Sequence, residues 1–138
     1  MNQLETLIFP TETVDFNGQS IAVRGLCLPD ITLIVRGHQQ VLAELYTQAI
    51  AGTLQGSVEE IAIRMVGDFV PLASLVIACG MDAPQSAATA AKLPLRVQAE
   101  SLEKIIKLTL VGEGGLEKLM EIVAGAMQGA VSLTFPKT

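Results

Sequence analysis

The sequence predicts a mainly α-helical protein with a short N-terminal β-hairpin, an α+β fold arranged as a compact bundle of four to five helices. An Asn-Gly dipeptide separates two runs in which apolar and polar residues alternate, and this pattern is typical of a hairpin. Further along the chain, apolar residues recur at helical spacing between prolines and glycines. The 138 residues can bury a core, and no linker or repeat divides them. We therefore expect a single domain over residues 1–138.

The first element is the hairpin, expected at about residues 12–24. Apolar residues alternate with polar ones on both sides of the turn, at Val14, Phe16, Ile21 and Val23. Between them, Asn17-Gly18 suits a type I′ turn, which needs positive φ at both central positions. Residues 7–9 are candidates for a third strand before Pro10. Because an isolated hairpin is only marginally stable in water, one of its faces is expected to pack on helices.

Helices are expected at about residues 30–51, 57–79, 85–92, 94–110 and 116–128. The first follows Leu28-Pro29-Asp30, which places a proline and an acid in the first turn. The second begins with a capping box formed by Ser57 and Glu60. Pro71 should kink or divide this second helix, because proline removes one backbone hydrogen bond and clashes with the preceding turn.

The later helices are also marked by proline and glycine. Pro94 suits the first position of the fourth helix, and its apolar stripe is expected to consist of Leu95, Gln98/Ala99, Leu102, Ile105/Ile106 and Thr109. The glycine-rich segment 112–115 predicts a turn before the last helix. The tail at 130–135 is expected to be strand-like or frayed.

Charge and cysteine content argue against several classes of protein. The formal net charge is -5, and the nine Lys and Arg residues are scattered, so we expect no binding to nucleic acid or to anionic membranes. The N-terminus lacks the pattern of a secretory signal, which favours the cytosol. Cys27 and Cys79 are 52 residues apart and form no CxxC pattern, so both are expected to be reduced packing residues.

The stretch from Phe69 to Met81 contains 13 residues without a charge. A membrane-spanning helix needs about 20 apolar residues, and Asp68 and Asp82 bracket this shorter stretch. We expect a helix buried in a protein core or interface.

The sequence shows no arrangement of residues that indicates catalysis. The single histidine, His38, has no recognisable partner acid or nucleophile. The glycine run at 112–115 follows a helix and lacks the GxxxxGK[ST] order of a phosphate-binding loop, so it is expected to end that helix. We expect no catalytic residues, no cofactor and no metal, and hence no enzyme.

The helices carry a surplus of apolar residues. Apolar residues make up 50% of the chain even without its 12 glycines, more than an ordinary soluble domain contains. A partner-binding apolar groove is predicted around Met65, Phe69, Leu72, Leu75 and Val76, together with self-association into a homo-oligomer. The alternative is that the surplus packs a denser core, and buried and partner-binding helices share this pattern.

Two segments carry a resemblance to a known family. They are VRGLCLPDI at Val23–Ile31, which follows the hairpin, and LPLRVQAESLEKI at Leu93–Ile105. With the order of the other elements over residues 12–125, the chain resembles the tail assembly chaperones of long-tailed bacteriophages, also called pre-tape-measure proteins.

This resemblance implies a function without chemistry. Members of the family bind and solubilise the aggregation-prone tape measure protein and help tail tube protein polymerise around it, in the cytoplasm of the bacterial host. They are absent from the mature virion, and many have a longer product made by ribosomal frameshifting. Two other classes remain open: a structural phage component such as a minor tail or head–tail connector subunit, and a small regulatory or ligand-binding domain.

Overall fold

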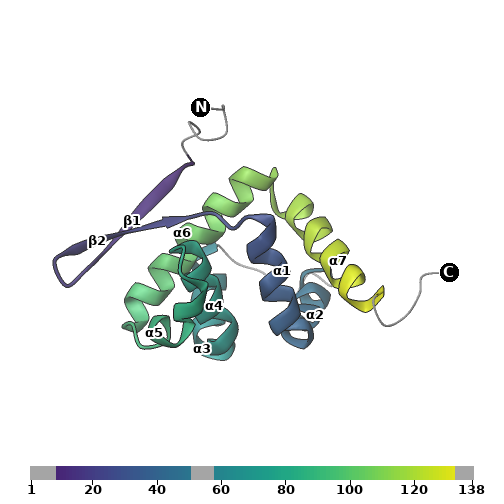
Figure 1. Ribbon diagram of the computed structural model, residues 1–138, viewed down its shortest axis with the longest axis horizontal. Coiled ribbons are helices and arrows are strands. Elements are labelled where there is room, and N and C mark those ends of the chain that lie inside the picture. The colour runs from purple at the N-terminus through teal and green to yellow at the C-terminus, as the bar shows by residue number, and fades with distance from the viewer. Residues whose placement is uncertain (1–8, 51–57, 133–138) are drawn as a thin grey trace.

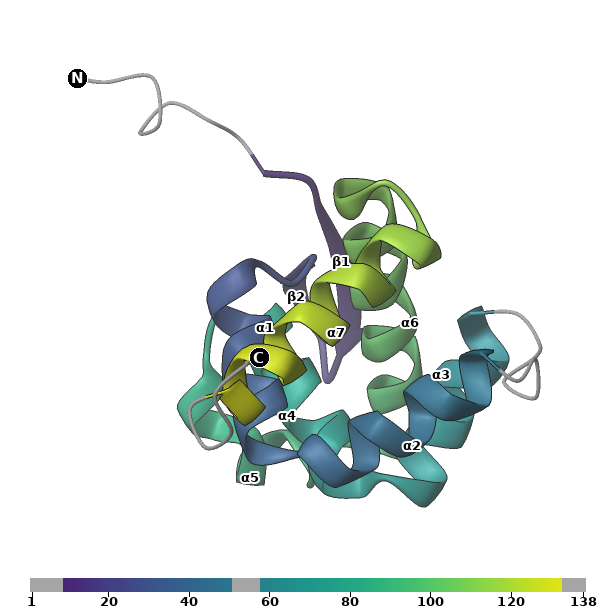
Figure 2. The ribbon, with the colours of Figure 1, turned by 90° about the vertical axis from the view of Figure 1, so that its right-hand side faces the viewer.

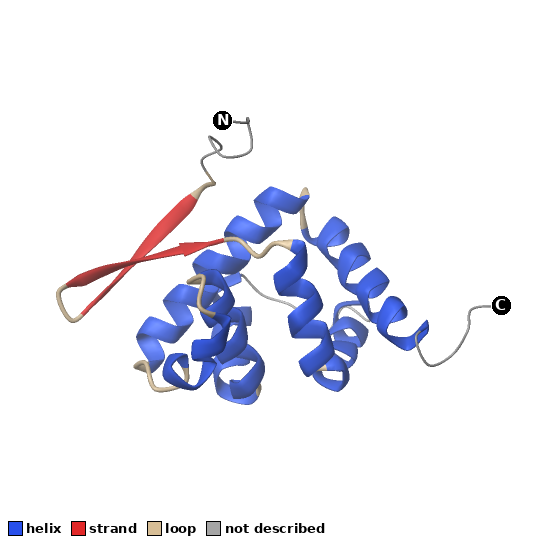
Figure 3. Cartoon of the chain, viewed as in Figure 1, coloured by secondary structure: helices blue, strands red, loops and turns tan. Residues whose placement is uncertain are grey.

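The computed structural model describes residues 9–50 and 58–132, and most of these residues are helical (Figures 1 and 3). The prediction of a mainly α-helical fold with an N-terminal hairpin is confirmed. The elements are β1 (Thr11–Phe16), β2 (Gln19–Arg24), α1 (Leu28–Gly37), α2 (Gln39–Ile50), α3 (Val58–Asp68), α4 (Val70–Gly80), the 3₁₀ turn η2 (Pro84–Ser86), α5 (Ala87–Ala90), α6 (Leu95–Glu113) and α7 (Leu116–Ser132). The described residues contain seven α-helices instead of four to five, because two expected helices are each divided.

The hairpin forms where the sequence predicts it. Asn17 and Gly18 have φ values of 54° and 77°, as a type I′ turn requires. β1 and β2 pair in antiparallel register, with Val14 opposite Ile21. Val14 and Val23 are buried, and both strands contact α6, while the turn points away from the helices (Figure 1). Of the expected third strand, residues 7 and 8 lie outside the described part, and Phe9 is not in a strand.

The helix expected over residues 30–51 is wrong as one element. It divides into α1 and α2 at His38, whose φ of -141° and ψ of 40° are not helical. Gly37, a weak helix former, ends α1 directly before this break. The apolar spacing continues across the break because α2 begins at the next residue, so periodicity alone does not reveal it. Helix α1 begins at Leu28, earlier than expected, because Cys27 is its N-cap and hydrogen bonds with Asp30.

The helix expected over residues 57–79 is also divided, as Pro71 predicted. α3 ends at Asp68, Phe69 has a non-helical φ of -131° and ψ of 56°, and α4 begins at Val70. Pro71 lies in the first turn of α4, where its missing N–H breaks no internal hydrogen bond. The predicted capping residue Ser57 lies outside the described residues.

The remaining helix boundaries also differ from the expected ones. The helix expected at 85–92 is a 3₁₀ turn followed by the four-residue α5. Pro94 is the N-cap of α6, and α6 and α7 run beyond 110 and 128, to Glu113 and Ser132. Residues 130–132 therefore belong to α7 and are not strand-like. Gly114, with a φ of 88°, ends α6 in the left-handed conformation, which glycine adopts at little cost.

Helix α4 supplies the centre of the core. It contacts α1, α3, α5 and α6, and from Leu72 to Gly80 every residue except Leu75 is buried. The uncharged stretch from Phe69 to Met81 is therefore largely a buried helix, as expected. Within the described part of the chain, none of the helices has the length and apolar character that crossing a bilayer requires. The other fully buried large side chains come from the hairpin, α1 and α6, and include Val35, Val97, Leu102 and Ile105.

Two glycines allow chain segments to approach α6 closely. A Cβ at Gly80 would overlap Cδ1 of Ile105, and a Cβ at Gly25 would lie 3.0 Å from the backbone nitrogen of Thr109. The backbone N–H of Leu26 donates to Oγ1 of Thr109 at 2.8 Å. The connection from β2 to α1 therefore lies directly against α6. Helix α7 packs along α1 and also contacts α6 (Figures 1 and 2).

Candidate functional site

The five residues predicted to bind a partner do not form one exposed surface. Leu72 and Val76 are only 1% and 5% exposed, because α4 is surrounded by α1, α3, α5 and α6. Met65, Phe69 and Leu75 are partly buried against the same core. In this structure Leu72 and Val76 pack the interior, and a contact of the other three with a partner stays a prediction.

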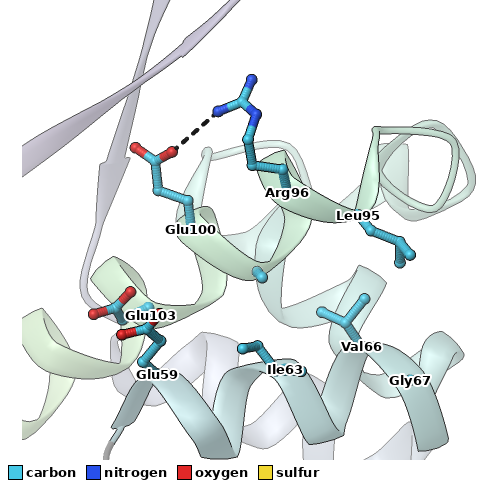
Figure 4. A pocket seen from close by; sticks show the side chains of 9 residues that line it. Glu59, Ile63, Val66, Gly67, Leu95, Arg96, Glu100 and Glu103 are labelled. Atoms are coloured by element: carbon cyan, nitrogen blue, oxygen red, sulfur yellow. Dashed lines mark hydrogen bonds and ion pairs between the residues drawn. The ribbon is translucent and has the colours of Figure 1, made fainter.

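An exposed apolar surface lies instead between α3 and α6. Ile63 on α3 is 54% exposed and Leu95 at the start of α6 is 69% exposed. Val66 and Ala99 also line the hollow between the two helices, which has a volume of about 570 Å³ (Figure 4). We call this hollow the α3–α6 groove; its full lining is Glu59, Ile63, Val66, Gly67, Leu95, Arg96, Ala99, Glu100 and Glu103.

Helical periodicity explains why these side chains line one groove. On α3 the lining residues are spaced by three or four positions, at 59, 63 and 66/67, and on α6 they recur at 95/96, 99/100 and 103. Residues at this spacing share one face of a helix. The two helices contact each other and run in opposite directions (Figure 4). The groove therefore extends along about two turns of each helix, or about 12 Å.

Charged side chains are distributed unevenly along the groove. Glu59 and Glu103 lie at one end, and Arg96 lies beside Leu95 towards the other (Figure 4). Lys107 donates to Glu103 at 2.7 Å, and hydrogen bonding to Glu103, with a smaller contribution from Glu59, raises the pKa of Lys107. Arg96 contacts Glu100 at 3.4 Å in an exposed ion pair. Such exposed pairs contribute little stability, so a charged partner can displace them at low cost.

The comparisons with known proteins identify the family. The family model described as "Pre-tape measure protein" matches residues 2–137. This chain belongs to the pre-tape-measure protein family. The family is related to bacteriophage tails, which agrees with the resemblance of the two segments around Val23–Ile31 and Leu93–Ile105. Neither curated proteins nor solved structures gave a match.

A second hollow of this pre-tape-measure protein, of about 620 Å³, lies between the β2–α1 connection and the C-terminal half of α6. Arg24 and Asp82, the charged residues that line this hollow, form an ion pair with each other. Nη1 of Arg24 donates to Asp30 at 2.7 Å, and Nη2 lies 2.8 Å from Oδ1 of Asp82. Asp30 also accepts from the backbone N–H of Cys27 at 2.9 Å. We call these four residues the Arg24 junction, and its contacts assign it a structural role.

The pKa shifts within the Arg24 junction support this role. Burial acts to raise the pKa of Asp30, but the hydrogen bonds from Arg24 and Cys27 outweigh burial and hold that pKa below its ordinary value. Hydrogen bonds to Asp30 and Asp82 raise the pKa of Arg24. Burial, with a smaller contribution from nearby Asp30, raises the pKa of the Cys79 thiol to about 11. The Cys79 thiol is therefore protonated and unreactive at neutral pH.

His38 and the glycine run at 112–115, which were considered for catalysis and for phosphate binding, lie at a helix break and at a helix end. His38 occupies the break between α1 and α2. The glycine run ends α6, with the N–H of Gly115 donating to the carbonyl of Leu110 at 2.7 Å, so the expected helix-ending turn is confirmed. Among the described residues, no group of three or more His, Cys, Asp or Glu side chains is placed to hold a metal ion.

The sequence interpretation missed the groove for two reasons. Leu95 was expected on the buried stripe of its helix, but it is the first residue of α6, where the helix end leaves it exposed. Ile63 lies off the buried face of α3, which is marked by Ala62 and Val66. An apolar residue on the polar face of an amphipathic helix is a signal that can be read from sequence.

Proposed function

We propose that this protein is a phage tail assembly chaperone that binds the tape measure protein and keeps it soluble, so that tail tube protein can polymerise around it. The family match over residues 2–137 carries the proposal. We further propose that it acts by binding, without catalysis or a cofactor. Its site of action is the cytoplasm of the bacterial host, and it is absent from the mature virion.

The physical properties of the chain support a role in binding apolar segments. Large apolar side chains remain exposed on several helices, among them Leu33, Ile63, Val70 and Leu95. Exposed apolar surface favours association with other chains, and the net charge of -5 favours solubility of the resulting complex. Leu33 and Val70 are exposed and lie outside the α3–α6 groove, and they support self-association, so the working form is proposed to be a homo-oligomer.

Co-expression with the tape measure protein encoded by the same phage tests this function. The tape measure protein alone should be found in the insoluble fraction, and co-expression should move it to the soluble fraction in a complex that survives affinity purification. A tape measure protein that stays insoluble would contradict the proposal.

Purified virions test the alternative of a structural component. Mass spectrometry should find the tape measure protein in the particles and should not find this chain. Stoichiometric amounts of this chain in particles would instead support a structural tail subunit.

A further inference from the structure

We infer that the α3–α6 groove binds one amphipathic helix of the tape measure protein in a fixed direction, with the N-terminal end of that helix at Glu59 and Glu103. This inference rests on the proposed function and adds to it a binding site, a partner chemistry and an orientation. The occupant is an apolar helix with a basic residue in its first turn.

The apolar part of the argument concerns Ile63 and Leu95. Both are large aliphatic side chains with more than half of their surface exposed, and they face a common hollow between Val66 and Ala99. Covering them removes apolar surface from water, which favours binding. A groove about 12 Å long holds two turns of a helix, and such a helix contacts it through residues spaced by three or four positions.

Charge complementarity determines the direction. Glu59 and Glu103 come from different helices and lie at the same end of the groove (Figure 4). Lys107 pairs with Glu103 at 2.7 Å, so two carboxylates and one ammonium leave an excess negative charge at this end, which favours a cation and the positive N-terminal end of a helix dipole. Arg96 is in the first turn of α6, a position where a cation is unfavourable for its own helix. It is 68% exposed and pairs with Glu100 at 3.4 Å, so this end of the groove has no excess negative charge, and the direction follows from the difference between the two ends.

The apolar contacts are tested by two substitutions and a matched control. Ile63→Glu and Leu95→Glu should each reduce the amount of soluble tape measure protein in co-expression by about tenfold or more, since each places a charge in the apolar contact. Val111→Glu is the control, because Val111 is 82% exposed on the same helix as Leu95 but is not part of the groove lining. All three positions are exposed, so far-UV circular dichroism and melting should stay close to wild type.

The direction is tested with overlapping peptides from the tape measure protein and fluorescence anisotropy. Glu59→Gln combined with Glu103→Gln should weaken the best-binding peptide by about threefold to tenfold. Replacing the basic residue in the first turn of that peptide by glutamine should remove this difference. The difference should also shrink at high salt, because the charges are exposed.

The outcomes distinguish a wrong assignment of the groove from a wrong proposed function. If wild type solubilises the tape measure protein and the two groove variants do so equally well, the groove assignment is overturned and the proposed function stands. If Ile63→Glu and Leu95→Glu instead convert an oligomer to monomers in sedimentation, the occupant is a second copy and the assignment is overturned. If wild type fails to solubilise the tape measure protein, both are overturned. Equal effects of the double Gln variant on peptides with and without the basic residue overturn the direction.

Discussion

Removing the carboxylate of Asp30 is expected to destabilise the fold more than removing any exposed acid. In the Asp30→Ala variant, Arg24 loses its 2.7 Å hydrogen bond, and a hydrogen bond to a charged group contributes about 1.5–3 kcal/mol. The backbone N–H of Cys27 loses its acceptor at 2.9 Å, and loss of such a cap costs about 0.5–2 kcal/mol. Arg24 keeps Asp82 as a partner, which limits the loss.

We therefore expect Asp30→Ala to lower the free energy of unfolding by about 2–4 kcal/mol at pH 7. The matched control is Asp15→Ala, since Asp15 also accepts a hydrogen bond, from Ser20 at 2.8 Å, but in an exposed position. Its effect should stay within about 0.5 kcal/mol. The chain has no tryptophan, so urea unfolding is best followed by far-UV circular dichroism, at several protein concentrations to separate folding from association.

The effect of Asp30 should also depend on pH. Its folded pKa lies below the ordinary value of 3.8, so its stabilisation is fully present above pH 3.8 and is lost as the pH falls through the folded pKa. The difference between wild type and Asp30→Ala should thus be constant from pH 7 to pH 5 and narrow below pH 3.8. A difference below about 0.5 kcal/mol at pH 7, or one that stays the same far below pH 3.8, would refute the reasoning.

Three further predictions concern packing and burial. Gly80→Ala should destabilise the fold by about 1–2 kcal/mol through overpacking, while Gly112→Ala, whose Cβ meets nothing within 4 Å, should stabilise α6 by about 0.5–1 kcal/mol; urea unfolding compares them, and equal effects would contradict the close packing. Ser101→Ala should leave stability unchanged or raise it by about 1 kcal/mol, because its buried hydroxyl has no partner; a clear loss in thermal melting would show that the hydroxyl is bonded. A thiol reagent at pH 8 should modify exposed Cys27 rapidly and buried Cys79 only after denaturation; rapid modification of two thiols in the native protein would contradict the burial of Cys79.

Local signals were sufficient to predict the hairpin and most of the helices. Asn17 and Gly18 readily adopt the positive φ values that the turn requires. This dipeptide and the alternating residues beside it are therefore enough to predict the hairpin. Pro71 likewise predicts the division between α3 and α4 from a single residue. The break at His38 was missed because the apolar spacing runs on through it, and because the two helices on its sides are joined without a loop.

Burial was harder to predict than secondary structure. Leu72 and Ile63 are both aliphatic residues on helices, yet one is buried and the other is 54% exposed. The difference arises from how many helices surround α4 and α3, and this depends on tertiary contacts between distant segments. For the same reason the groove, which joins residues from 59 to 103, could not be assembled from the sequence.

The hydrogen bond between Leu26 and Thr109 spans 83 residues, and this separation has a consequence for synthesis on the ribosome. At about 5–20 residues per second, α6 follows the hairpin out of the ribosome after about 4–17 s. During this interval the hairpin lacks α6, the helix that both of its strands contact, and a hairpin is only marginally stable by itself; α4 also emerges before α6, which packs against it. The nascent chain therefore exposes its own apolar segments to the host's folding machinery until α6 is made. A protein proposed to protect another chain from aggregation is itself exposed to aggregation during its own translation.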